Sequence, residues 1–450
     1  MPVGPSYRPA PTWPALPRLH DVVEVDRFPE HRLRWRHEAA GEVGLDTLSD
    51  AEWLDHFGRF HPLPDNLPQP LALRYHGHQF GHYNPALGDG RGVLFAQVRD
   101  DRGRLLDLGT KGTGPTPYSR GGDGKLTLQG AVREVLASEL LAARGVDTCR
   151  ILSVVETGED LFRTDEPSPT RSAVMVRLSH SHVRIGTFQR LAFYEDRDGL
   201  EALVAYVAEH LLPDVEGPVD LLRQAGTRLF ATCAAWMAAG FVHGVLNTDN
   251  LNVTGESFDY GPWRFLQRWD PRFTAAYFDH QGYYAFGRQP WAVGWSLARL
   301  AGALALIADI DALQGTLDDL VRASARQQHV ALLRRMGVAP RDPASDEALA
   351  RSLVTFLEGT ALTVDEVMWD WHGGVAGAER AMRGPRADRY AARAFDPVRR
   401  ALTGYDGPTD DDSPLVGLPD DEVKALWAHI AGGDDWAPVH QRIAAIRRSR

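Results

Sequence analysis

The stretch HGVLNTDN occupies residues 243–250, and the triplet DYG at residues 259–261 begins nine residues after its last residue. Together they carry a carboxylate at Asp249, an amide at Asn250 and a second carboxylate at Asp259. Oxygen groups of this kind are the ligands that Mg²⁺ prefers in proteins. The two stretches therefore predict a divalent-cation site.

The spacing matches the catalytic loop of protein kinases, except at one position. A kinase loop has a His, an Asp two residues later and an Asn five residues after that, with DFG on the next hairpin. Here His243 and Asn250 keep the spacing and Asp259 begins the DFG-like triplet, but Val245 replaces the Asp. Because that Asp accepts the substrate proton in kinases, ordinary phosphoryl transfer lacks its usual base here. Asp249 is the nearest carboxylate in the loop.

The segment before this loop has the pattern of a strand-rich lobe. GVLFAQV (92–98) and LLDLGTKG (105–112) predict a β-hairpin, and apolar residues at helical spacing predict a helix over 127–144. ILSVVETG and AVMVRLS predict two further strands. Lys111 ends the second strand of the hairpin, and Glu134 follows 23 residues later on the helix. This separation suits a lysine–glutamate pair of the kinase type.

Lysine is scarce in this chain, and glycine is concentrated around two of the lysines. Only three of the 49 basic residues are lysine, namely Lys111, Lys125 and Lys424. A lysine kept against such a bias is expected where a compact ammonium matters. The glycine-rich segment GDGRG (88–92) opens the hairpin and allows close approach to a phosphate.

The composition excludes several classes of protein. The chain has 450 residues, of which 44% are hydrophobic and 24% charged, so it is neither disordered nor fibrous. A net charge of −11 argues against general binding of nucleic acids or of anionic membranes. The apolar run 300–308 is too short to span a bilayer. Two cysteines and a polar N-terminus predict a cytoplasmic protein.

These patterns predict an α+β, protein-kinase-like fold with two lobes. A Pro-rich arm (1–70) is expected to pack on a strand-rich N-lobe (71–187), followed by a helix-rich C-lobe (188–450) that carries the catalytic and metal-binding loops. Predicted C-lobe helices cover 199–212, 219–240, 291–309, 312–336 and 345–359. The histidines of HxHxxxH at 76–82 are expected to make structural hydrogen bonds rather than to bind zinc.

The chain resembles the selenoprotein O family of kinase-like protein adenylyltransferases. The matching text covers most of residues 75–305 in the family's order: HGHQFGHYNPALGDGRG (76–92), KGTGPTPYSRGGDGK (111–125), VREVLASE (132–139), SHSHVRIGTFQ (179–189), HGVLNTDN with DYGPWRF (243–265) and FDHQGYYAFGRQPWAVGWSLARLAGAL (278–304). The chain ends without the Cys or selenocysteine segment of the family's longer members, and beyond about residue 310 little family text remains.

The resemblance implies a role for each matching position. Asp249 is the implied proton acceptor, Glu134 the partner of the phosphate lysine, and Asn250 and Asp259 the ligands of Mg²⁺ or Mn²⁺. The implied nucleotide-binding residues are Gly88, Gly90, Arg91, Lys111, Asp123, Gly124, Arg177 and Arg184.

The resemblance also implies an activity. Such an enzyme transfers AMP from ATP to Ser, Thr or Tyr of a protein substrate and releases pyrophosphate. Two alternatives remain open from the residues alone. One is a kinase of proteins or small molecules, and the other is a pseudokinase that binds a nucleotide without catalysis.

Overall fold

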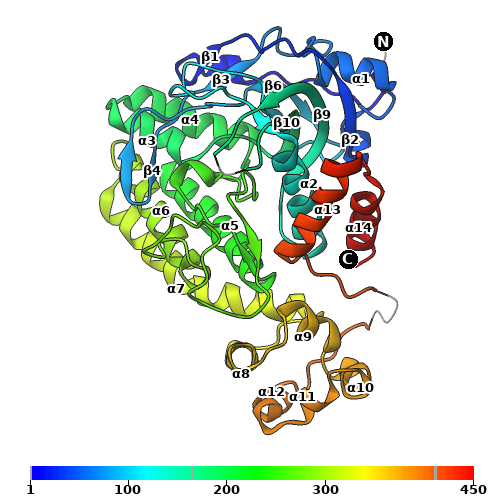
Figure 1. Cartoon of the computed structure of the whole chain (residues 1–450). Helices are drawn as coiled ribbons and strands as arrows, with labels where there is room; N and C mark the ends of the chain where they lie inside the picture. The colour runs from blue at the N-terminus through cyan, green and yellow to red at the C-terminus, as the bar shows by residue number, and fades with distance from the viewer. Residues whose placement is uncertain (1–2, 165, 410–412, 450) are drawn as a thin grey trace.

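The structure is a computed structural model that describes residues 3–164, 166–409 and 413–449. It has a strand-rich first part and a helix-rich second part, which confirms the predicted α+β organisation (Figure 1). An eight-stranded sheet, antiparallel at every pairing, forms the centre of the first part. The main row of strands, in spatial order, is β1 (His20–Val22), β3 (Leu71–Leu73), β6 (Leu94–Arg99), β7 (Leu105–Lys111), β10 (Thr170–Ser179), β9 (Arg150–Leu161) and β2 (Arg32–Arg36). The short strand β8 (Leu126–Thr127) lies outside this row and pairs with β10.

The predicted hairpin and the helix that follows it are confirmed. Strands β6 and β7 pair antiparallel, with Val98 opposite Leu106 and a register shift between Leu94 and Ala96, and helix α2 (Leu128–Ala143) begins where Thr127 caps it. The threonine hydroxyl accepts a hydrogen bond from the backbone N–H of Gly130 at 3.0 Å. This cap fixes the start of the helix that carries Glu134.

The N-terminal segment forms part of the sheet as well as covering it. It supplies the edge strands β1 and β2, and its helix α1 (Asp50–Phe57) carries Trp53 and Phe57 into a core with Phe95 of β6. The Trp53 indole N–H also donates to the Ser153 hydroxyl of β9 at 2.9 Å. The N-terminal segment therefore covers part of the sheet, which helps to explain why β7 is buried at every residue.

The helices of the second part begin and end within a few residues of their predicted positions. Helix α3 (Ile185–Phe193) was not predicted as a separate element, because it begins inside the expected lobe boundary. The larger helices are α4 (Arg197–His210), α5 (Pro218–Ala238), α6 (Gln289–Leu304), α7 (Ile310–Arg335) and α8 (Pro343–Gly359). Short strands β11 (Phe241–Val242) and β12 (Arg264–Phe265) pair around the 243–261 loops.

The helices in the last third of the chain pack in two different parts of the molecule. Helix α8 and the short helices α9 (Val364–Asp370), α10 (Ala378–Arg383), α11 (Ala387–Ala391) and α12 (Asp396–Ala401) share one separate core with the end of α7. Helices α13 (Asp420–Gly433) and α14 (Ala437–Arg448) return to the first part and pack on α2 (Figure 1). The apolar side chains of these two helices join the core around α2. The predicted domain division, with residues 188–450 in one lobe, stays a prediction.

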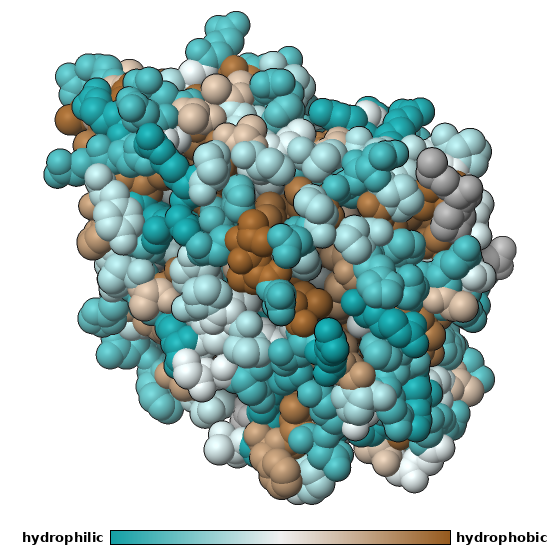
Figure 2. All heavy atoms as spheres, turned by 90° about the horizontal axis from the view of Figure 1, so that it is seen from above, coloured by the Kyte–Doolittle hydropathy of each residue, from teal (hydrophilic) through white to brown (hydrophobic). Residues whose placement is uncertain are grey.

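Among the described residues, no helix combines the length and the apolar character needed to cross a membrane. Seen over the first part of the molecule, the surface is mainly hydrophilic, with hydrophobic residues gathered near the centre of that face (Figure 2).

Arg447 of α14 holds this helix to α2, and we expect its replacement to destabilise the protein in a pH-dependent way. Its guanidinium donates to both oxygens of the buried Glu139 carboxylate, at 2.8 and 2.9 Å. Burial raises the pKa of Glu139, but hydrogen bonds from Arg447 and His37 lower it to about 2. Arg447→Gln should reduce the free energy of unfolding by about 1–3 kcal/mol at neutral pH.

The pKa of Glu139 is lower in the folded protein than in the unfolded chain. The ionised carboxylate therefore adds to the free energy of unfolding at pH values above the unfolded-state pKa, and this stabilisation is lost as the pH falls through about 2. The stability deficit of Arg447→Gln should therefore shrink on acidification, as measured by urea unfolding at several pH values. Arg448→Gln, at the exposed neighbouring position, is the control. A deficit that does not change with pH would contradict this account of the pair.

Candidate active site

A buried ion pair joins the end of β7 to α2. The Lys111 ammonium contacts the Glu134 carboxylate, and both side chains are less than a tenth exposed. Burial lowers the pKa of Lys111, and the neighbouring Glu134 carboxylate opposes that shift. The predicted lysine–glutamate pair is thus formed, and it fixes the ammonium at the inner end of the strand.

Three cationic side chains converge on the Asp259 carboxylate. Arg177 of β10 and Arg184 at the start of α3 each donate to it at 2.9 Å, to different oxygens. The Lys111 ammonium lies 3.5 Å from the oxygen that Arg177 contacts. Although burial raises the pKa of Asp259, these cations hold it well below its usual range. The cluster brings together four residues that lie in four separate segments of the chain.

Several groups besides the Asp259 carboxylate hold Arg184 in place. It donates to the backbone carbonyl of Asp249 at 2.9 Å and lies 3.3 Å from the Asp89 carboxylate. Its guanidinium also stands over the rings of Tyr75 and Phe258, at 4.5 and 4.8 Å from their centroids. Cation–π contacts of this kind rigidify a buried guanidinium. Asp89 lies between Gly88 and Gly90 but was not among the predicted site residues.

The 243–250 loop places Asp249 and Asn250 beside this cluster. Both lie in a short 3-10 turn, Thr248–Asn250. The Asn250 side-chain amide donates to the carbonyl of Val245 at 2.8 Å, which leaves its oxygen free to bind a cation. The Asp249 Oδ1 atom is buried and has no hydrogen-bond partner among the described residues. Burial raises the pKa of Asp249 to about 6, against the opposing effect of Arg184.

Gly88 and Gly90 pack against the segment that follows Lys111. A Cβ atom at Gly88 would clash with the Tyr118 ring, and one at Gly90 would lie 2.8 Å from the Tyr118 carbonyl oxygen. The Ser119 hydroxyl donates to the carbonyl of Gly90. These glycines are therefore needed for the close contact of two loops, a reason that differs from the predicted contact with a phosphate. Arg91 beside them is exposed.

Asp123 and Gly124 close the loop after Lys111. The Arg163 guanidinium donates to both oxygens of the Asp123 carboxylate, at 2.8 and 3.1 Å. The backbone N–H of Gly114 donates to the carbonyl of Gly124 at 3.2 Å. Both residues hold the loop closed, and their contact with a nucleotide stays a prediction.

A second set of polar contacts supports the 243–250 loop from behind. The Thr248 hydroxyl donates to Gln189 of α3 at 2.5 Å and accepts from the backbone N–H of His78 at 2.8 Å. The Tyr284 hydroxyl donates to Asn247 at 2.8 Å. None of these supporting residues was predicted as part of the site, because they become neighbours only in the folded chain. The histidines at 76 and 78 do form hydrogen bonds, as expected.

Comparison with known proteins agrees with this geometry. Residues 11–373 match the family model described as "Protein adenylyltransferase SelO". A protein from Gloeobacter violaceus, named protein nucleotidyltransferase YdiU, is 41% identical over 95% of this chain and 92% of its own length. One with the same name from Synechococcus elongatus is 49% identical over 74% of this chain and 70% of its own length.

A MAP kinase from Leishmania major aligns over 80% of this chain and 91% of its own, at 12% identity and a TM-score of 0.24, a value too low to support any argument. The family model decides the assignment, because residues 11–373 include the Lys111–Glu134 pair, the arginines on Asp259 and the 243–250 loop. The chain belongs to the SelO family of protein adenylyltransferases.

Proposed function

We propose that this chain transfers AMP from ATP to Ser, Thr or Tyr hydroxyls of a protein substrate. As a SelO family member it is a protein nucleotidyltransferase. The observation that carries the finer proposal is the convergence of Lys111, Arg177 and Arg184 on one carboxylate beside the 243–250 loop. Cations fixed in this way in a buried site suit the charge of a triphosphate.

The cations are organised before the nucleotide binds. Lys111 is held by Glu134, and Arg184 by Asp89 and by two aromatic rings, so binding requires little rearrangement of the side chains. The phosphates of ATP would share these donors with Asp259. Gly88, Gly90, Arg91, Asp123 and Gly124 are proposed to border the nucleotide, because their two loops pack on each other and one of them follows Lys111 directly.

Asp249 is proposed to accept the proton of the attacking hydroxyl. The hydroxyl oxygen bonds to the α-phosphorus, the bond from that phosphorus to the bridging oxygen breaks, and pyrophosphate leaves. Val245 occupies the position of the kinase base and cannot accept a proton. Asp249 lies in the same loop, and its unpartnered Oδ1 and its pKa of about 6 suit a base that works near neutral pH.

The oxygen atoms beside this cluster fit a divalent cation. The free amide oxygen of Asn250 and the Asp259 carboxylate are hard ligands. Among the described residues there is no group of three or more His, Cys, Asp or Glu side chains placed to hold a metal. Asn250 and Asp259 would thus hold Mg²⁺ or Mn²⁺ together with phosphate oxygens of the substrate. Such an ion, when bound, neutralises phosphate charge.

The cytoplasmic location also belongs to the proposal. It is supported by Cys149 and Cys233, which are both buried free thiols. Free thiols persist in reducing compartments.

The proposed reaction is tested by two labelled forms of ATP. Incubation of the purified chain and candidate proteins with Mg²⁺ and ATP labelled at the α-phosphate should leave label on protein. ATP labelled at the γ-phosphate should leave none, because that phosphate departs in pyrophosphate. Transfer of the γ-label would instead show a kinase. Nucleotide binding with no transfer of either label would show a pseudokinase.

Replacement of Lys111 should remove most of the transfer activity. Lys111→Ala removes the ammonium, and Lys111→Arg forces a larger planar group into a buried space already shared with Glu134 and Arg177. We expect both variants to lower kcat/KM by about 10²-fold or more in a transfer assay with the α-label. The control is Lys424→Arg, which makes the same change at an exposed lysine of α13. Full activity of Lys111→Arg would refute the need for a compact ammonium.

Asp249→Asn should slow the transfer without weakening ATP binding to a similar degree. The substitution keeps the shape of the side chain and removes its basicity, so kcat should fall by about 10²–10⁴-fold. Val245→Asp, which restores a carboxylate at the kinase position, should not increase AMP transfer. Steady-state kinetics with a direct ATP-binding measurement separate the two effects. Unchanged kcat in Asp249→Asn would limit this residue to positioning.

A further inference from the structure

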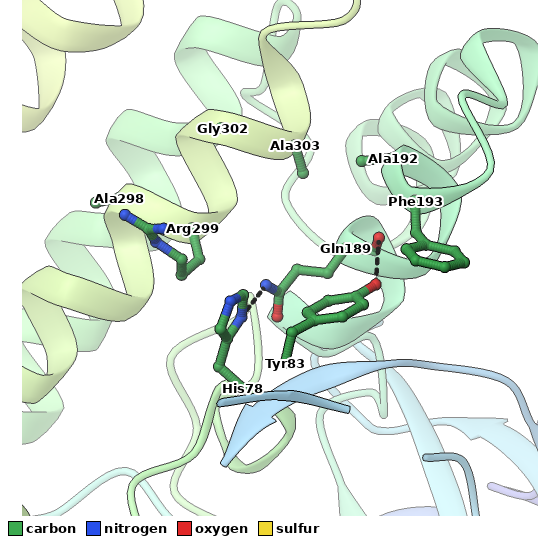
Figure 3. A pocket seen from close by; sticks show the side chains of 9 residues that line it. All are labelled: His78, Tyr83, Gln189, Ala192, Phe193, Ala298, Arg299, Gly302 and Ala303. Atoms are coloured by element: carbon green, nitrogen blue, oxygen red, sulfur yellow. Dashed lines mark hydrogen bonds between the residues drawn. The ribbon is translucent and has the colours of Figure 1, made fainter. Parts of the chain in front are cut away.

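A pocket with a volume of about 420 Å³ lies behind the 243–250 loop. It is a hollow open to solvent, bordered by α3, by α6 and by the hairpin of β4 (Gly77–Gln79) and β5 (His82–Asn84), and side chains from all three face one common space (Figure 3). None of the residues proposed to hold ATP lines it. The lining residues are His78, Tyr83, Gln189, Ala192, Phe193, Ala298, Arg299, Gly302 and Ala303.

The pocket exists because the two helices present small residues toward each other. α6 contributes two alanines and Gly302, and α3 contributes Ala192. A Cβ atom added at Gly302 would find no atom within 4 Å, so the space beside it is open. On the opposite side the rings of Tyr83 and Phe193 are stacked, with centroids 5.5 Å apart and planes at 24°. These walls suit a flat apolar group.

The polar groups left free in the pocket are hydrogen-bond donors. Thr248 accepts from the His78 backbone N–H, so its hydroxyl proton goes to the side-chain oxygen of Gln189. The Gln189 amide N–H then donates to Nδ1 of His78 at 2.7 Å. The remaining proton of the neutral ring therefore lies on Nε2, which can donate. Burial lowers the pKa of His78, in keeping with a neutral ring.

Arg299 supplies a cation at the same wall. Its guanidinium stands over the Trp295 ring at 4.9 Å from the centroid, and it forms no ion pair with any other described residue. No acidic side chain lines the pocket. A ligand with an anionic end would therefore meet two donors and no repelling charge.

We propose that this pocket binds a small aromatic carboxylate, with its ring between the stacked aromatic pair and the small residues of α6 and its carboxylate on Arg299 and His78. The volume lies toward the lower end of the range for ligand sites, which favours a small acid over a nucleotide. The site is separate from that of ATP, but Gln189 links its wall to Thr248, the residue before Asp249.

The test is a ligand-observed NMR titration of the full chain with phenylacetate and with its neutral analogue phenylacetamide. We expect saturable binding of the acid, about tenfold tighter than that of the amide. Arg299→Gln should make the two affinities equal. Gly302→Leu, which fills the pocket from an exposed helical position, should abolish binding of both. Added ATP should not displace the acid.

Two matched variants on α7 serve as controls. Arg326→Gln removes an exposed arginine, and Gly315→Leu fills open space at an exposed helical glycine. Both should bind phenylacetate as the parent does. Equal affinity for acid and amide in the parent, displacement by ATP, or unchanged binding in Gly302→Leu would each overturn the proposal. The readout is binding rather than transfer, so the result stands apart from that of the proposed function.

Discussion

The Asp259 carboxylate is the interaction on which the rest of the site depends. Lys111, Arg177 and Arg184 would repel one another in a buried space if no anion lay between them. Asp259 supplies that anion, and so connects two strands, the start of α3 and the DYG loop. The backbone of Asp259 has a φ of 53°, an uncommon conformation that aims its side chain into this cluster.

Helix α2 must be held firmly for this cluster to form, because it carries Glu134 to Lys111. The sheet packs along one side of it, and helices α13 and α14 from the far end of the chain pack along another. Glu139, on the same helix as Glu134, is bound by His37 from the N-terminal segment and by Arg447 from α14. Both termini of the protein thus help to fix the position of the glutamate that orients the lysine.

The side of the site where we propose that the acceptor hydroxyl binds is built differently from the side proposed for the phosphates. Charge dominates where the phosphates are proposed to bind. The 243–250 loop, besides the bond from Arg184 to the Asp249 carbonyl, is held by neutral hydrogen bonds of Thr248 with Gln189 and His78. Neutral contacts of this kind position a loop without changing the local charge. They also connect the loop to the pocket between α3 and α6, where a free arginine and two aromatic rings remain exposed to a ligand.

The sequence by itself determined the α+β class, the β6–β7 hairpin, helix α2 and the Lys111–Glu134 pair. Each of these depends on local periodicity, or on a spacing that one strand and the next helix make fixed. The kinase-like spacing also predicted Asn250 and Asp259 as cation ligands and drew attention to the neighbouring Asp249, and these roles stay predictions. Only the tertiary structure decided that Asp89 and Tyr75 hold Arg184, that Tyr118 requires the glycines before β6, and that α14 braces α2. These contacts join residues far apart in the chain, and no local pattern specifies which side chains the folded backbone brings together.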